Sequence, residues 1–245
     1  MVPHVLVLAK EPRPGCVKTR LCPPCSPAEA AQVAEAALAD TLQAVAASGA
    51  ERRIVALDGA PGPWLPEGFE VVAQAHGPLE RRLAAAWEAA AGPGLQIGMD
   101  TPQVTATDLD DALSALDRSD AVLGPALDGG WWLIGLHRPN RRVFSGIPTS
   151  RSDTGARQLA RLRHLGFDVG VVPPQRDLDT FDDAVTIASA HPHLATAAAV
   201  ATVLGVHASR SRAVRRGDPT SNALVAAKPH RFRAGRVNLS PESRK

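Results

Sequence analysis

Two kinds of hydrophobic pattern alternate along the chain. Short apolar runs bounded by Gly, Pro or charged residues predict buried β-strands, and apolar residues at three- and four-residue spacing predict helices. Strands are expected at residues 4–8, 53–57, 69–73, 95–100, 121–124, 131–136 and 167–172. Helices are expected at about residues 26–48, 79–91, 105–116, 152–165, from 181 onward, and 194–204. The first of these helices begins with the capping-box pair Ser26 and Glu29.

This alternation of strands and helices predicts an α/β fold. We expect a single doubly wound, mainly parallel sheet with helices on both faces, as in Rossmann-like proteins. Apolar residues make up 44% of the chain and aromatic residues 4%, so Ala, Val and Leu have to fill the core. That composition favours helices packed on a sheet over a small β-barrel. In such a sheet a ligand binds at the carboxyl ends of the strands.

Charge divides the chain into two parts. We expect residues 1–206 to form the domain and residues 207–245 to be a basic, disordered tail. The tail has ten Lys or Arg residues against two acidic residues, a net charge of +8, and no hydrophobic periodicity. The body has 17 basic and 23 acidic residues, a net charge of −6. A basic tail that binds nucleic acid usually has aromatic residues between its cations, and here Phe232 alone interrupts them. We therefore expect no nucleic-acid partner.

The sequence predicts a cytoplasmic protein without a membrane span. No apolar run approaches the roughly 20 residues that cross a bilayer, and the first run is too short for a signal peptide. The cysteines Cys16, Cys22 and Cys25 lie close together, and the last two have the spacing of a metal or redox pair. Without a second such pair or nearby histidines, we interpret them as loop thiols in a reducing compartment.

The loop at residues 8–21 is the first candidate for chemistry. It follows the first predicted strand, bends at prolines and Gly15, and presents Lys10, Lys18 and Arg20 before the first helix. Backbone N–H groups and cations in a loop between a strand and a helix are typical of phosphate binding in α/β proteins. The alternative is a solvated basic loop.

Several carboxylates follow predicted strands. Asp100 directly follows the fourth strand, where a divalent metal that bridges phosphates could be held, although Asp before Thr-Pro also suits a turn. Asp177 and Asp179 share one face if their segment is extended, although either can cap the next helix. Asp128 precedes Gly129-Gly130, which allow either a close approach of a ligand or a plain turn.

Taken together and in this order, these segments resemble the nucleotide-diphospho-sugar transferase superfamily, the glycosyltransferases of the A fold and related nucleotidyltransferases. The chain is most similar to a bacterial branch of arsenosugar-biosynthesis-type glycosyltransferases. The resemblance covers about residues 4–190. The matching segments are 9–10, 14–15, 17–21, 97–102, 123–125, 128–130, 133–136, 146–148 and 177–180.

The resemblance implies a nucleotide site and a metal site. Asp100 would bind Mg²⁺ or Mn²⁺ with Asp179 as the second ligand, and Asp177 is the less favoured second ligand. The residues expected to bind the nucleotide or face the substrate are Lys10, Gly15, Lys18, Thr19, Arg20, Gly129 and Gly130. Lys18, Asp100 and Asp128 are expected to act in catalysis. If the reaction inverts the sugar, Asp128 or Asp153 would be the base.

The expected activity is metal-dependent transfer from a nucleotide sugar to a small-molecule acceptor. A nucleotidyltransferase that uses an NTP and releases pyrophosphate is the alternative, because the Lys18–Leu21 run and Asp128–Gly130 also resemble guanylyltransferases that act on 2-phospholactate or phosphoenolpyruvate. In both reactions cations neutralise a leaving diphosphate. A third, less favoured hypothesis is a non-catalytic binder of nucleotides or nucleic acids.

Overall fold

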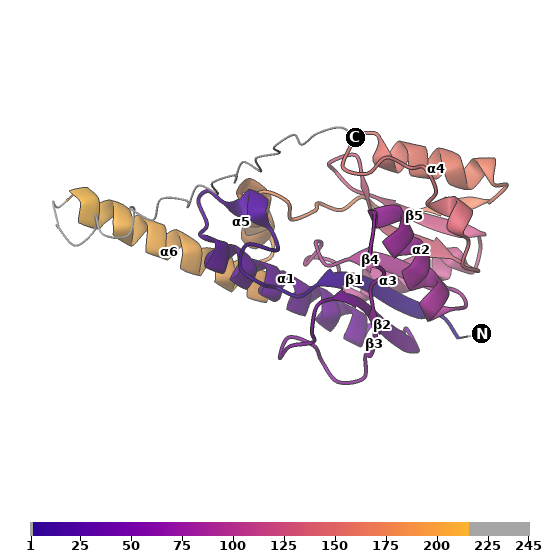
Figure 1. The fold of residues 1–245 in the computed structure, drawn as a ribbon, viewed down its shortest axis with the longest axis horizontal. Helices are drawn as coiled ribbons and strands as arrows, with labels where there is room; N and C mark the ends of the chain where they lie inside the picture. Colours follow the sequence, from indigo (N-terminus) through magenta and orange to yellow (C-terminus); the bar gives the residue numbers. More distant parts are fainter. Residues whose placement is uncertain (1, 216–245) are drawn as a thin grey trace, which may run out of the picture. The chain divides into compact units, whose positions relative to one another are not determined.

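The computed structural model describes residues 2–215, with side chains to residue 209, and Figure 1 traces the order of its elements. The strands are β1 (His4–Lys10), β2 (Arg52–Asp58), β3 (Glu70–Ala73), β4 (Gly94–Gly98), β5 (Ala121–Pro125), β6 (Trp131–Leu136) and β7 (Val169–Val171). The helices are α1 (Pro27–Ala47), α2 (Leu79–Ala90), α3 (Ala106–Leu116), α4 (Thr154–His164), α5 (Phe181–Ala190) and α6 (Ala195–Arg215), with short 3₁₀ turns η1 (Thr19–Leu21) and η2 (Arg141–Val143).

The strands form one 7-stranded sheet in the order β3-β2-β1-β4-β6-β5-β7. Strand β1 pairs in parallel with β2 and β4, and β5 pairs in parallel with β7. Strand β6 alone among the described strands runs antiparallel to its neighbours, β4 and β5. The predicted single, mainly parallel α/β sheet is therefore confirmed. Because β6 is reversed, the connection from β5 to β6 lies at the carboxyl ends of β4 and β5.

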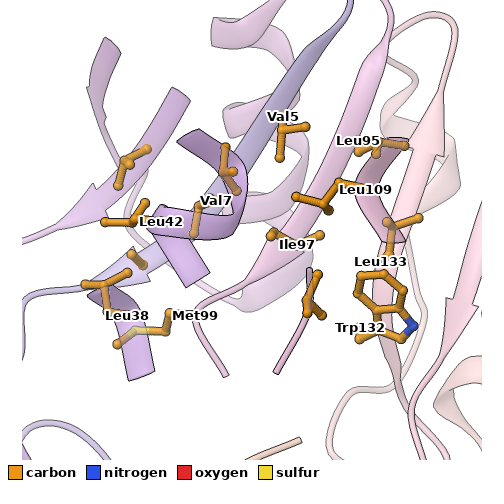
Figure 2. Close-up of a cluster of buried hydrophobic side chains, with 14 of the residues drawn as sticks. Val5, Val7, Leu38, Leu42, Leu95, Ile97, Met99, Leu109, Trp132 and Leu133 are labelled. Carbon is orange, nitrogen blue, oxygen red and sulfur yellow. The ribbon is translucent and has the colours of Figure 1, made fainter. Parts of the chain in front are cut away.

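Helices cover both faces of this sheet, as predicted. On one face, α1 and α3 pack on β1, β4 and β6 through a core of buried hydrophobic residues (Figure 2). The labelled members of this core are Val5, Val7, Leu38, Leu42, Leu95, Ile97, Met99, Leu109, Trp132 and Leu133. On the other face, α2 and α4 supply Leu83, Trp87 and Leu162 to a second core. Alternation along a strand sends successive side chains to opposite faces of the sheet, as for Ala121 and Leu123 in the second core and Val122 in the first.

A third cluster anchors the loops that later form the site. Leu21, in η1, and Leu178, before α5, are both fully buried against α1, α5 and α6. Helices α1 and α5 each begin with a capping box, at Ser26 and Thr180, which fixes where the preceding loops end. The loop that contains Lys18 is thus anchored by Leu21 and ends at the capped helix α1. The loop that contains Asp179 is anchored by Leu178 and ends at the capped helix α5.

Two boundaries differ from the sequence prediction. The strand predicted at residues 95–100 ends at Gly98, so Asp100 lies in the following loop. The helix predicted to end at Leu204 continues to Arg215, so the prediction that residues 207–245 lack structure was wrong for residues 207–215. Those residues contain neither Gly nor Pro, and the single Gly205 inside a helix costs only about 1 kcal/mol. The rest of the predicted tail, residues 216–245, lies outside the described residues.

The chain divides into two compact units, residues 1–204 and residues 205–245. The sheet and its covering helices belong to the first unit. Among the described residues, no helix is both long and apolar enough to cross a membrane.

We predict that His4, at the start of β1, makes the fold sensitive to acid. The side chain is fully buried, and its ring packs edge-on against Trp87 with centroids 5.3 Å apart. Burial, with a smaller contribution from Arg52, lowers the pKa of His4 to about 4. The unfolded chain therefore takes up a proton near pH 6.5 that the folded protein accepts only near pH 4. The free energy of unfolding should fall by up to about 3 kcal/mol between these pH values and then level off.

Urea unfolding of the wild type and of His4→Leu at several pH values between 7 and 3.5 tests this prediction. The variant fills the buried position with an apolar side chain and removes the titrating group, so the difference between the two curves isolates His4. Identical pH dependence in the two proteins would contradict the assignment.

Candidate active site

Lys18 lies at the centre of the candidate site. The loop after β1 turns at Gly15, with φ +76°, and delivers Lys18 immediately before η1. Lys18 itself has φ 48° and ψ 37°, a left-handed conformation that few residues other than glycine adopt. Its side chain is only 9% exposed, so most of it is enclosed by protein. A strained backbone and an enclosed ammonium group are features that functional sites commonly show.

The Lys18 ammonium joins three separate loops. Its Nζ lies 2.5 Å from Asp100 Oδ1, in the loop after β4, and also donates to the backbone carbonyl of Leu178. The backbone N–H of Leu178 in turn donates to the carbonyl of Asp100 at 2.7 Å. The loops after β1, β4 and β7 are therefore fixed to one another around a single cation.

A second cation and carboxylate lie beside this centre and are open to solvent. Arg20 Nη1 lies 2.5 Å from Asp179 Oδ2, and the two side chains are 67% and 44% exposed. An exposed ion pair contributes little to folding stability. Arg20 can therefore exchange Asp179 for an anionic ligand at small cost.

Asp177 shows how strongly negative the rest of the site is. Burial, together with smaller contributions from the nearby carboxylates of Asp100, Asp128 and Asp179, raises the pKa of Asp177 to about 7, against the opposing effect of Lys18. The region therefore holds more carboxylates than cations, because among the described residues Lys18 and Arg20 pair only with Asp100 and Asp179. This is the electrostatic arrangement that an added cation would stabilise.

The described residues do not form a complete metal site by themselves. No group of three or more His, Cys, Asp or Glu side chains among them is arranged to hold a metal ion. Mg²⁺, however, is usually held by one or two carboxylates together with substrate phosphates. Asp100 and Asp179 are both partly exposed oxygen donors and fit such a shared site, in which phosphate would complete the ligand set.

Two cavities meet at these residues. The larger has a volume of about 390 Å³ and extends over the carboxyl end of β4 and the amino end of β6 towards α2 and α4. The smaller, of about 330 Å³, lies over β1 and the loop that follows it. Both are lined by Lys18, Arg20, Asp100 and Asp179, which we call the shared rim. The rim is thus the place where a group bound in one cavity could reach a group bound in the other.

Most of the residues predicted from the sequence reach one of the cavities. Asp128, Gly130 and Asp177 line the larger one, and Lys10 and Thr19 line the smaller one. Gly15 and Gly129, by contrast, line neither.

Gly15 and Gly129 were expected to contact the nucleotide or the substrate directly. In the structure each instead has a role in shaping its own loop. Gly15 allows the turn before Lys18, because its φ is positive. At Gly129 a Cβ atom would lie 2.0 Å from the carbonyl oxygen of Ser152, so glycine is needed for close packing of two loops.

Asp153 is also placed away from the reacting groups. It lines neither cavity and is paired with Arg151 at 3.2 Å and Arg157 at 2.7 Å. Hydrogen bonding to these two guanidinium groups lowers the pKa of the Asp153 carboxyl. The suggestion that it acts as a base is therefore corrected: its contacts make it an anchor at the start of α4.

Sequence reasoning missed several cavity residues. Gln74 and Arg82 line the smaller cavity, where Arg82 Nε donates to Gln74 Oε1 at 2.7 Å. Gln96 and Gln158 line the larger one. Two of these had a detectable signal: Gln74 directly follows β3, and Gln96 is the one polar side chain in an otherwise apolar strand. Arg82 and Gln158 could not be recognised in this way, because polar residues are common in helices such as α2 and α4.

Comparison with known proteins agrees with this architecture. A family model described as "Uncharacterized protein conserved in bacteria (DUF2064)" matches residues 30–151. A crystal structure from Desulfovibrio desulfuricans G20, of a protein inferred to be a nucleotide-diphospho-sugar transferase, is 26% identical with a TM-score of 0.74. That alignment covers 82% of this chain and 94% of the other. The resemblance to nucleotide-diphospho-sugar transferases is confirmed. The narrower likeness to the arsenosugar-type branch stays a prediction.

Other solved structures are more distant. Rv0371c from Mycobacterium tuberculosis H37Rv, in complex with manganese, is 19% identical with a TM-score of 0.46, over 76% of this chain and 98% of the other. A CMP:2-keto-3-deoxy-manno-octonic acid synthetase complexed with CTP is 12% identical with a TM-score of 0.47, over 76% and 97%. Likenesses this distant carry no argument about function. No curated protein matches the chain by sequence.

We predict that Cys16, which lines the smaller cavity, reacts with alkylating reagents well before the other two thiols. Cys16 is exposed, whereas Cys25 is buried. Burial raises the pKa of Cys22 and raises the pKa of Cys25 to about 11, which reduces the reactive thiolate form of both. Timed labelling with iodoacetamide at pH 8, followed by peptide mass mapping, should show Cys16 modified first. Protein unfolded in urea is the control, and equal rates for the three thiols in folded protein would contradict the placement.

Proposed function

We propose that this chain is a transferase that takes a nucleotide-activated donor, and that the donor is a nucleotide sugar. The observation that carries the proposal is the pair of cavities joined at the shared rim. A nucleotide sugar has three parts in series: a nucleoside, a charged diphosphate and an uncharged sugar. The smaller cavity, the rim with Lys18 and Arg20, and the larger cavity offer matching environments in the same order. The similarity to the Desulfovibrio protein supports the same class.

Lys18 and Arg20 would bind the diphosphate. In glycosyl transfer the acceptor hydroxyl attacks the anomeric carbon, and the nucleoside diphosphate leaves with increased negative charge on its terminal phosphate. Cations already in place stabilise that charge without reorganising in the transition state. The enclosed Lys18, fixed by Asp100 and Leu178, suits this role, and the exposed Arg20 can close on the phosphates from outside.

Asp100 and Asp179 would hold a divalent ion together with the phosphates, with Asp177 next to them. Around Asp177 the carboxylates of Asp100, Asp128 and Asp179 outnumber Lys18. A diphosphate entering this region therefore needs additional positive charge. Mg²⁺ or Mn²⁺, when bound, would supply it by neutralising the leaving group.

Asp128 is the candidate to accept the proton of the acceptor hydroxyl. It lines the larger cavity, and its Oδ1 accepts the backbone N–H of Gly130 at 2.7 Å, which orients the carboxylate. The rest of the group is exposed and free to meet an acceptor entering from solvent. With Asp153 paired to two arginines, Asp128 is the better placed of the two expected bases.

Nucleotidyl transfer is the second candidate. The shared rim would serve it equally, since pyrophosphate needs the same neutralisation, and Arg151 on the wall of the larger cavity could hold an anionic acceptor. Arg151 is already paired with Asp153. The fully buried part of that wall contains no charged residue. These two facts favour glycosyl over nucleotidyl transfer.

Product analysis separates the two candidates. With Mg²⁺ or Mn²⁺ and a panel of NDP-sugars and NTPs, we expect release of a nucleoside diphosphate from one NDP-sugar and no pyrophosphate from any NTP. Chromatography of nucleotides and a pyrophosphate assay measure both on the same samples. Pyrophosphate released from an NTP would replace the glycosyltransferase proposal with the second candidate.

Two variants in the same loop provide the control for the site. Lys18→Met removes the enclosed cation, and because hydrogen bonds to charged groups contribute about 1.5–3 kcal/mol, nucleotide binding should weaken at least about tenfold. Arg13→Met removes a neighbouring cation that lines neither cavity, so binding should not change. Equal effects of the two substitutions would show that the loop acts only through its overall charge.

A further inference from the structure

The inner wall of the larger cavity combines an apolar surface with uncharged polar groups. Ten of its lining residues are buried, and none of the ten is charged. The apolar members nearest α2 and η2 include Leu83, Phe144 and Ile147. The polar members include Gln96, Thr101 and Gln158. Ligand pockets are typically built in this way, with a few polar groups on an apolar surface that fix orientation.

Gln96 is the exceptional residue of this wall. It lies in the middle of β4, with 0% of its surface exposed. Neither its amide nitrogen nor its amide oxygen has a hydrogen-bond partner, and the hydroxyl of Thr101 in the same wall also lacks one. Buried polar groups are nearly always hydrogen-bonded, because leaving one without a partner destabilises the protein. Gln96 and Thr101 are therefore expected to find partners in something that enters the cavity.

The other buried glutamines show what a structural role looks like here. The amide nitrogen of Gln158 donates to the carbonyl of Val143 at 2.9 Å and so holds η2 against α4. The amide nitrogen of Gln103 donates to the carbonyl of Arg176 at 2.7 Å, and Gln103 lines neither cavity. Each of these amide nitrogens is used by the fold, although the amide oxygen of Gln103 has no partner, whereas neither amide atom of Gln96 is used.

We propose that this inner wall is a subsite for an uncharged, hydroxyl-bearing ring, and that Gln96 is the residue that determines specificity for it. A sugar ring presents an apolar face, which suits Leu83 and Phe144, and hydroxyl groups, which can both donate to and accept from the amide of Gln96. A carboxylate or phosphate would be left without a counter-charge on this wall. The inference rests on the proposed function only for the source of the ring, which is either the donor's sugar or the acceptor.

The first test needs no ligand. Replacing an unpartnered buried amide with an apolar group of similar size removes a destabilising feature, so Gln96→Leu should raise the midpoint of thermal unfolding. Gln103→Leu is the matched control and should lower the midpoint, because it leaves the Arg176 carbonyl without its donor. If Gln96→Leu lowers the midpoint as much as Gln103→Leu does, Gln96 is a structural residue and the proposal is overturned.

The second test compares probes with and without the ring. We expect calorimetry to show that UDP-glucose binds more tightly than UDP, or GDP-mannose more tightly than GDP, in the wild type. Gln96→Leu should reduce that preference about tenfold and leave the affinity for the nucleoside diphosphate without a hexose unchanged. Gln103→Leu should leave the preference intact. This result assigns the ring to the donor.

The remaining outcomes are equally decisive. If the ring adds nothing to donor binding, but Gln96→Leu raises the KM of a neutral monosaccharide acceptor about tenfold, the ring belongs to the acceptor and the proposal holds. If donor preference and acceptor KM are both unchanged in Gln96→Leu, the proposal is overturned. If no nucleotide binds the wild type, the proposed function fails separately, and the order of the two unfolding midpoints still decides whether Gln96 serves a ligand.

Discussion

The contact of the Lys18 ammonium with Asp100 and with the carbonyl of Leu178 is the interaction on which the site depends. It fixes the loops after β1, β4 and β7 to one another, and the buried Leu21 and Leu178 on either side anchor two of those loops in the core. The same contact means that Asp100 and a bound phosphate would compete for the Lys18 ammonium. The cation best placed for a phosphate is already engaged by a carboxylate, so binding a nucleotide means sharing or releasing Lys18. A divalent ion on Asp100 would free the ammonium for the phosphate, which links the metal and the nucleotide energetically.

The reversed strand β6 explains why the shared rim borders a second cavity besides the one over β1. Because β6 runs antiparallel to β4 and β5, the turn that contains Asp128 returns to the edge where the parallel strands end. This turn and the inner wall beside Gln96 bound one cavity, while the loop after β1 bounds the other. A purely parallel sheet would have carried the chain away to the opposite edge at this point. The fold thereby places Asp128, the proposed proton acceptor, and the uncharged inner wall together in the larger cavity.

Much of the fold and part of the site could be predicted from the sequence. Apolar runs and the capping box at Ser26 identified the strands and the first helix, because local pattern and tertiary structure agree there. Lys18, Arg20, Asp100 and Asp179 were identifiable because charged groups follow strands in a fold whose ligands bind at strand ends. Gly129 was misread, since glycine before a ligand and glycine beneath another loop look alike in sequence. The unpartnered amide of Gln96 could not be predicted, because whether a buried polar group is satisfied depends on neighbours distant in sequence.

A crystal structure with a nucleoside diphosphate and Mn²⁺ would test the central claim most directly. The account predicts the two phosphates within hydrogen-bonding distance of Lys18 and Arg20, and anomalous scattering from manganese between the phosphates and Asp100 or Asp179. It also predicts the nucleoside in the cavity lined by Gln74 and Arg82. Phosphates bound away from the shared rim, with the Lys18–Asp100 contact unchanged, would contradict the account.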